Sequence, residues 1–160
     1  MKLNLGCGRD YRNGWVNVDV RRNIFTDVVH DLDVLPYPFK DNTFDEVLLS
    51  HILEHIKDPI STLKEIIRIS KSRARIIVKV PHAHSYAQIS DLQHKNSFSE
   101  HSFSKKHLRE YEIDELVLVK RIFEFPSNRW KKYLPGKSLL KIFFNGIYDD
   151  LYFEFKVRKN

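Results

Sequence analysis

Two glycines and one aspartate near the start of the chain have the spacing of a ligand-binding turn. Residues 2–5 alternate in polarity as a β-strand does, and Gly6-Cys7-Gly8 follows as a tight turn. A second β-rich run over residues 15–18 ends at Asp19. Glycines let backbone amides approach a ligand, and an acid at the tip of the next strand accepts the hydroxyls of a ribose. The stretch predicts a nucleotide-type pocket; the alternative is a β-turn-β unit whose acid caps a helix.

A dinucleotide-binding fingerprint would have a third glycine and an acid about 20 residues further on. Here Tyr11 takes the third glycine position, and Asp19 comes eleven residues after Gly8. The letters LNLGCG and GWVNVD resemble instead the first motif of the class I S-adenosylmethionine-dependent methyltransferases, in the small type 11 group. The resemblance implies that Gly6, Cys7 and Gly8 wrap the methionine end of S-adenosylmethionine and that Asp19 binds its ribose.

A second stretch, LPYPFKDNTFDEVLLSHILEHI, is similar to the same group and lies in register with the first. The resemblance implies that Asp31 and Leu32 lie beside the adenine, and the alternative for Asp31 is a turn-capping role. The cofactor-binding residues implied in this way are Leu5, Gly6, Cys7, Gly8, Asp19, Val20, Asp31, Leu32, Ser50 and His51.

The elements that must position these residues follow an α/β rhythm. The six residues between Gly8 and Trp15 are too few for a full crossover helix. Apolar spacing predicts strands at 27–32, 44–50, 75–80, 116–125 and 151–158, a helix from His51 that restarts at Asp58-Pro59, and a short helix at 104–111. We predict one domain over 1–160: a Rossmann-like, mostly parallel sheet flanked by helices, with an antiparallel last strand, a shortened first crossover and no N-terminal helices.

Histidines supply the candidates for acid-base chemistry. His51, His82 and His94 are the candidate catalytic residues, since an imidazole can take a proton from a hydroxyl or amine acceptor. The long loop after Pro81 is expected to meet the substrate through His82, Tyr86, Asp91 and His94. The alternatives are a packing role for His51 and an inert polar loop for the others.

Metal and thiol chemistry are not expected. His51 and His55 would share a helix face, but no glutamate follows the first histidine as a metalloprotease motif requires. Imidazoles in a loop without a cysteine partner are usually polar loop residues, which is how we interpret His82, His84, Asp91 and His94. The single cysteine, Cys7, lies within the Gly-rich turn facing the cofactor, which sets aside a thiolate nucleophile.

The composition of the chain limits the kinds of partner that it is expected to bind. No apolar run reaches 18 residues, so no membrane span is expected, and one cysteine in 160 residues suits a reducing cytoplasm. Thirteen of the 27 Lys and Arg residues, against 8 of the 21 Asp and Glu, lie in residues 101–160. The basic, aromatic insertion 128–146 is expected to be a lid over the sheet, and the alternatives are binding to nucleic acid or a membrane surface.

The sequence therefore predicts methyl transfer from S-adenosylmethionine to an unidentified small-molecule or glycan O or N acceptor, by a monomer or homodimer. Two alternatives are a protein that binds S-adenosylmethionine without turnover and a nucleic-acid-binding module using residues 128–146.

Overall fold

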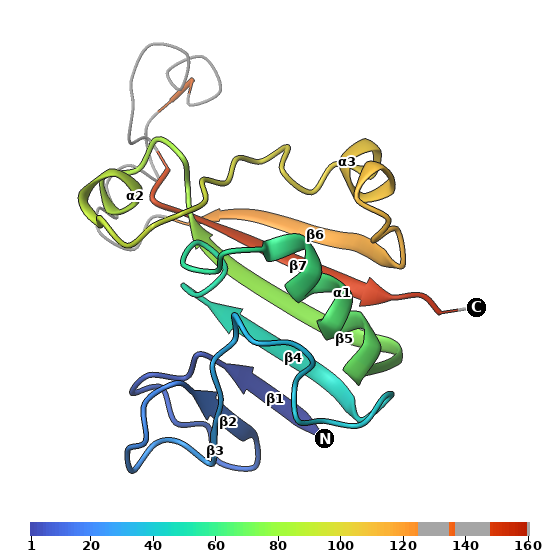
Figure 1. Ribbon diagram of the computed structural model, residues 1–160. Helices are drawn as coiled ribbons and strands as arrows, with labels where there is room; N and C mark the ends of the chain where they lie inside the picture. The colour runs from blue at the N-terminus through green and yellow to red at the C-terminus, as the bar shows by residue number, and fades with distance from the viewer. Residues whose placement is uncertain (125–134, 137–147, 160) are drawn as a thin grey trace.

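The computed structural model describes residues 1–124, 135–136 and 148–159. Figure 1 shows a single twisted sheet with α1 lying across it and α2 beyond one of its edges. In chain order the elements are β1 (Lys2–Leu5), β2 (Val16–Asp19), β3 (Val28–Val29), β4 (Phe44–Ser50), α1 (Pro59–Ile69), β5 (Ser70–Pro81), α2 (Tyr86–Ser90), α3 (Lys105–Glu110), β6 (Leu116–Glu124) and β7 (Asp150–Val157).

The sheet has the mixed topology expected from the sequence. Its order is β3-β2-β1-β4-β5-β7-β6; the first five strands pair in parallel, and β7 is antiparallel to both β5 and β6. Residues 6–15, which join β1 to β2, contain no helix, so the first crossover is short as predicted. Parallel strands end at one edge of a sheet, and Leu5, Asp19, Ser50 and Pro81 therefore share what we call the carboxyl edge, where open α/β sheets bind ligands.

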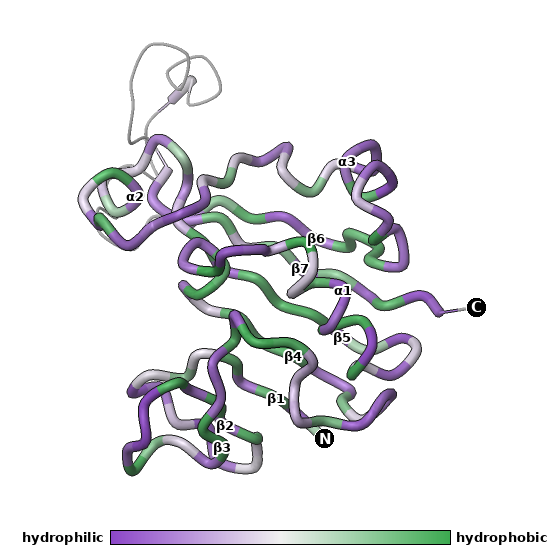
Figure 2. Tube along the Cα trace, viewed as in Figure 1, coloured by the Kyte–Doolittle hydropathy of each residue, from purple (hydrophilic) through white to green (hydrophobic). Residues whose placement is uncertain are grey.

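One face of the sheet carries the hydrophobic core. Val47 of β4, Ile76 of β5 and Phe153 of β7 are fully buried, and they belong to the same cluster as Ile66 of α1 and Leu108 of α3. Figure 2 shows hydrophobic stretches along β4 and β5 in the middle of the sheet. Burial of apolar area at about 25 cal/mol per Å² is what holds α1 and α3 on this face.

The opposite face carries charged cross-strand pairs. Glu46 of β4 lies 2.9 Å from Lys2 and 3.0 Å from Arg75 of β5, and Arg75 lies 2.8 Å from Glu154 of β7. Alternate residues of a strand point to opposite faces, so Arg75 faces this ladder while Ile76 enters the core. Within the described ranges, the helices that flank the predicted sheet, α1 and α3, pack on one face, and the charged ladder occupies the other.

The helix α1 begins at Pro59, later than the helix expected from His51. The Asp58 carboxylate accepts hydrogen bonds from two N–H groups of the first turn at 3.0 and 3.1 Å, and proline at the first position needs no donor. Residues 51–58 form turns instead, from which Leu53 still reaches the core. The expectation that His51 and His55 share a helix face is therefore wrong.

The remaining elements differ mainly in length from the prediction. The strand expected at 27–32 is reduced to the two residues of β3, and the Asp31 carboxylate accepts the Asp33 N–H at 3.0 Å within a turn. The strands expected at 116–125 and 151–158 are found as β6 and β7, and the helix expected at 104–111 is α3. The short helix α2 within the loop after β5 was not predicted.

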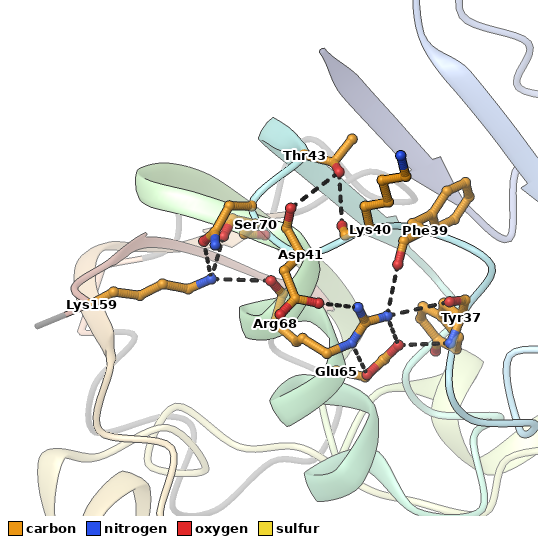
Figure 3. A network of polar contacts seen from close by, with 10 residues as sticks. Tyr37, Phe39, Lys40, Asp41, Thr43, Glu65, Arg68, Ser70 and Lys159 are labelled. Carbon is orange, nitrogen blue, oxygen red and sulfur yellow. Dashed lines mark hydrogen bonds and ion pairs between the residues drawn. The ribbon is translucent and has the colours of Figure 1, made fainter.

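A polar network fixes the loop before β4 to the end of α1 (Figure 3). The Glu65 carboxylate accepts the backbone N–H of Tyr37 at 2.6 Å and the Nε–H of Arg68 at 2.8 Å. Arg68 also donates to the carbonyl of Phe39 at 3.0 Å. Lys159, beyond β7, donates to the carbonyl of Arg68 at 3.1 Å. The network joins three segments, the loop before β4, the end of α1 and the residues after β7, at the edge opposite the carboxyl edge.

None of the helices in the described ranges is both long and apolar enough to cross a bilayer. Apart from Pro135 and Gly136, the insertion 128–146 lies outside the described residues, as does Phe125 at the expected end of β6.

Candidate functional site

The Gly-rich turn and Asp19 converge at the carboxyl edge. The Gly8 N–H donates to Asp19 Oδ2 at 2.8 Å, and the Arg21 N–H donates to Asp19 Oδ1 at 2.9 Å. The Cys7 N–H donates to the Val18 carbonyl at 2.9 Å, which extends the pairing of β1 with β2 into the turn. A carboxylate has about four acceptor positions, so each oxygen of Asp19 keeps capacity for a ligand hydroxyl.

The two glycines of the turn have different roles. Both have positive φ, +65° at Gly6 and +53° at Gly8, which L side chains rarely adopt. A Cβ added at Gly6 would lie 2.0 Å from Cγ1 of Ile52, whereas one at Gly8 would meet nothing within 4 Å. Gly6 is therefore required by packing against the loop after β4, and Gly8 leaves open space in which a ligand can approach the backbone.

Two buried asparagines support the Gly-rich turn through hydrogen bonds, and the sequence analysis missed them. Asn4 Nδ2 donates to Asn17 Oδ1 at 3.2 Å and to the Asp10 carbonyl at 2.7 Å. Asn17 donates in turn to Asp27 Oδ2 from its backbone and side-chain nitrogens, both at 2.8 Å. Satisfied buried networks of this kind rigidify a backbone. Their sequence signal was an asparagine between two apolar residues in each strand, LNLG and VNVD.

Cys7 supports the turn through its interior side. Its side chain is only 4% exposed, and its thiol donates to the Phe25 carbonyl at 3.2 Å. Burial, reinforced by the charge of Asp19, raises the pKa of this thiol. The expectation that Cys7 faces the cofactor is corrected accordingly: the thiol points toward the loop before β3.

The residues expected beside the adenine lie next to Asp19. The His30 N–H donates to the Asp19 carbonyl at 3.0 Å, which places Asp31 close to the same edge. Asp31 is exposed and caps its turn, Leu32 is buried, and Val20 is 59% exposed. The turn-capping alternative for Asp31 is thus realised, and its carboxylate keeps one oxygen outside that contact.

His51 follows Ser50, the half-buried last residue of β4, at the same edge. Its φ of +54° lies in the left-handed region, an uncommon conformation for a residue other than glycine that is often found at functional sites. His51 Nδ1 lies 3.6 Å from Glu54 Oε1 and Nε2 lies 3.8 Å from Asp150 Oδ2, while 47% of the side chain is exposed. The interaction with Glu54 raises the pKa of His51, with a further contribution from Asp150 and against the effect of burial.

The other two candidate bases are more enclosed than His51. His82 is 7% exposed, its Nδ1 accepts the His84 N–H at 3.1 Å, and its Nε2 lies 3.4 Å from Glu100 Oε2. The His94 side chain is 8% exposed, its Nδ1 lies 3.2 Å from the Gln88 carbonyl, and its Nε2 faces Asp91 at 3.7 Å. Of the expected substrate contacts, Tyr86 and Asp91 are exposed. Because their ring nitrogens contact other groups of the same loop, His82 and His94 contribute to the structure of this loop.

Two hollows lie around α3 and away from the Gly-rich turn. One of about 700 Å³ is lined by Leu116 and Arg158, at the edge opposite the carboxyl edge. One of about 290 Å³ lies between the start of α1 and residues 96–103. Neither is lined by Gly8 or Asp19, so neither serves the predicted ligand site.

Comparison with known proteins identifies the same group as the sequence motifs. Residues 7–78 match the family described as "Methyltransferase domain". An uncharacterized protein of Methanocaldococcus jannaschii, MJ0638, is 34% identical over 99 residues, which are 59% of this chain and 41% of that protein. The chain thus spans less than half of the length of this relative.

Solved structures with low sequence identity share the fold. A S-adenosylmethionine-dependent methyltransferase from Archaeoglobus fulgidus superimposes with a TM-score of 0.67 at 18% identity, covering 97% of this chain and 85% of that one. The 1,6-didemethyltoxoflavin-N1-methyltransferase of Burkholderia thailandensis, solved with S-adenosylhomocysteine, gives 0.66 at 14% identity, covering 99% and 71%. These comparisons do not support the nucleic-acid-binding alternative. Residues 7–78 therefore resemble a methyltransferase domain, and the chain as described shares the fold of S-adenosylmethionine-dependent methyltransferases of known structure.

Proposed function

We propose that the carboxyl edge binds S-adenosylmethionine and that the protein transfers its methyl group to an oxygen or nitrogen of a small-molecule or glycan acceptor. The observation that carries the proposal is the 2.8 Å hydrogen bond from the Gly8 N–H to Asp19 Oδ2. It fixes the carboxylate beside a glycine with open space around it, and both carboxylate oxygens retain acceptor capacity for ribose hydroxyls.

The other cofactor contacts follow from the same edge. Leu5, Gly6 and Cys7 carry the backbone of the turn, Val20 and Asp31 flank Asp19 on the side assigned to ribose and adenine, and Leu32 supplies apolar surface. Ser50 and His51 close the site from the end of β4. When bound, S-adenosylmethionine supplies a methyl group already activated by the sulfonium, so the protein has mainly to align the acceptor and accept a proton.

Among the three candidate bases, we assign proton acceptance to His51. Its side chain is half-exposed at the carboxyl edge. The carboxylates of Glu54 and Asp150, near Nδ1 and Nε2, orient its ring. His82 and His94 lie in the loop after β5, where with Tyr86 and Asp91 they would shape the acceptor side. The acceptor class is the least constrained part of the proposal.

The direct test is incorporation of labelled methyl from S-adenosylmethionine into pooled small molecules and glycans. We expect incorporation by the wild-type protein, its loss in Asp19→Ala, and no change in Asp114→Ala, an exposed acid away from the turn. His51→Gln should lower kcat by about 10²- to 10⁴-fold with the KM for S-adenosylmethionine unchanged. Cofactor binding without incorporation into any pool would instead support binding without turnover.

A further inference from the structure

Glu54 is a buried carboxylate that the fold leaves without hydrogen bonds. The residue is fully buried, and among the described residues neither Oε1 nor Oε2 has a hydrogen-bond partner. His51 Nδ1, at 3.6 Å from Glu54 Oε1, is at an ion-pair distance that is longer than a hydrogen bond. A buried carboxylate is costly unless its oxygens are hydrogen-bonded or coordinate a metal, and the long ion pair with His51 leaves both oxygens open to a further ligand.

Two histidines face the same point as Glu54. One donor atom each from Glu54, His55 and His94 lies within 4.8 Å of the other two, and the two imidazole rings meet edge to face with centroids 4.7 Å apart. A tetrahedral ion with ligands at about 2.0–2.1 Å would bring such atoms to about 3.3 Å from one another, which small side-chain rotations can reach. Two imidazoles and a carboxylate form a ligand set used by zinc and related ions.

The contacts of Nδ1 in both histidines also favour metal binding through Nε2. His55 Nδ1 lies 3.3 Å from the Gln93 carbonyl, and His94 Nδ1 lies 3.2 Å from the Gln88 carbonyl. A carbonyl oxygen accepts a hydrogen bond from Nδ1–H, and in that tautomer the free lone pair lies on Nε2. Metal-binding histidines are typically oriented by such a bond from the other nitrogen. Asp91, whose Oδ2 lies 3.7 Å from His94 Nε2, is placed to supply an oxygen as a fourth ligand.

Backbone contacts hold the two loops that carry these ligands. The Lys95 and Asn96 N–H groups donate to the Glu54 carbonyl at 2.8 and 3.1 Å, and Asn96 Nδ2 donates to the Ile56 carbonyl. Glu54 and His55 come from the turns after β4, and His94 from the loop after α2. The relative position of the ligands is therefore fixed by main-chain hydrogen bonds rather than by the ligands alone.

We propose that Glu54, His55 and His94 bind a divalent transition metal of the Zn²⁺ type, with Asp91 or water in the fourth position. Mg²⁺ and Ca²⁺ are disfavoured because they prefer all-oxygen sites. This site differs from the His82, His84, Asp91 and His94 set weighed from the sequence, and it is an alternative to the expectation of no metal. It joins the loop after α2 to the turns that carry His51, and it does not depend on S-adenosylmethionine.

The test is titration of the chelator-treated full chain with Co²⁺, without S-adenosylmethionine, followed by visible absorption and competition by Zn²⁺. We expect one ion per chain with the d–d bands of a low-coordinate site. His55→Ala, His94→Ala and Glu54→Gln should each weaken binding by roughly 100-fold or more, at least as much as loss of an orienting group does. The control variants His84→Ala and His101→Ala remove exposed histidines and should bind as the wild type does.

The result that would overturn the proposal is Co²⁺ binding that is absent, or equal in the wild type and all three ligand variants. Binding lost in the control variants would mark adventitious capture by exposed histidines, and would equally overturn it. Circular dichroism checks that each variant is folded; because the His55 ring is partly exposed, His55→Ala removes little buried surface and keeps the test decisive. A failure here would leave cofactor binding at Asp19 untouched, so the two proposals fail separately.

Discussion

Two buried glutamates on either side of the start of α1 have opposite environments. The Glu65 side chain is 9% exposed and is satisfied by the Tyr37 N–H and by the guanidinium of Arg68 (Figure 3). The Glu54 side chain is 1% exposed, and neither of its oxygens has a hydrogen-bond partner among the described residues. The two side chains are similarly buried, but Glu65 has a structural role at one edge of the sheet and Glu54 is a candidate ligand-binding residue at the other.

The number of hydrogen-bond donors to the carboxylate, more than its burial, distinguishes the two roles. Glu65 holds the loop before β4 against α1, and it can do so only while its carboxylate is charged. Glu54 lies among histidines at the carboxyl edge, where His51 and His94 belong to the predicted site residues. Substitutions at the two positions should therefore have different consequences for stability.

The largest expected effect is at the satisfied site. Among the described residues, Arg68→Ala leaves the buried Glu65 carboxylate with the Tyr37 N–H as its remaining hydrogen-bond donor, and it removes the donor to the Phe39 carbonyl. We expect a loss of about 3 kcal/mol in the free energy of unfolding, measured by urea denaturation. A loss below about 0.5 kcal/mol, the size of an ordinary surface change, would contradict the structural role.

Paired substitutions at the two glutamates sharpen the comparison. Glu65→Gln should cost about 2 kcal/mol, because it removes a charge that is hydrogen-bonded to Arg68. Glu54→Gln in the metal-free chain should change stability by less than about 0.5 kcal/mol or increase it, because it removes a buried charge whose oxygens accept no hydrogen bond and whose ion pair with His51 is long. Equal losses in both variants would remove the distinction between the two sites.

The pH dependence of stability should distinguish Glu65→Gln from the wild type. The hydrogen bonds from Arg68 hold the pKa of Glu65 below its ordinary value of 4.5, against the effect of burial. A lowered pKa in the folded state stabilises the protein fully above the unfolded value, and this contribution is lost as the pH falls through the folded pKa. Urea denaturation between neutral pH and pH 3 should show a shallower decline in Glu65→Gln than in the wild type. An unchanged slope would contradict the assignment.

A smaller loss of stability than at Arg68 or Glu65 is expected at the helix start between the two glutamates. Asp58→Ala removes the acceptor for two N–H groups of α1 and should cost about 1 kcal/mol, as loss of an N-cap does. Asp58→Asn keeps the acceptor and is the matched control. Equal stability of Asp58→Ala and Asp58→Asn would show that the cap does not position α1.

Local patterns predicted the sheet and the Gly-rich turn. The turn needs glycines, the strands alternate in polarity, and Asp19 follows a strand that can only be the neighbour of β1 after so short a connection. The same patterns failed after β4, because the apolar spacing of Leu53 and Ile56 fits a series of turns as well as a helix. The cap at Asp58 and Pro59 was the better guide to where α1 begins.

The cluster of Glu54, His55 and His94 could not be found from local spacing. His94 is far from the other two along the chain, and main-chain bonds from Lys95 and Asn96 to Glu54 bring it into place. Likewise, the alternation of Arg75 with Ile76 in β5 signalled a polar face of the sheet, but assigning that face to solvent required the register of β4 and β7.

The most direct test of the central claim is calorimetric titration of the chain with S-adenosylmethionine. The account predicts one site in the wild type, the same affinity in Asp114→Ala, and at least about 10-fold weaker binding in Asp19→Ala, which loses hydrogen bonds to a charged acceptor. Equal dissociation constants for the wild type and Asp19→Ala would contradict it.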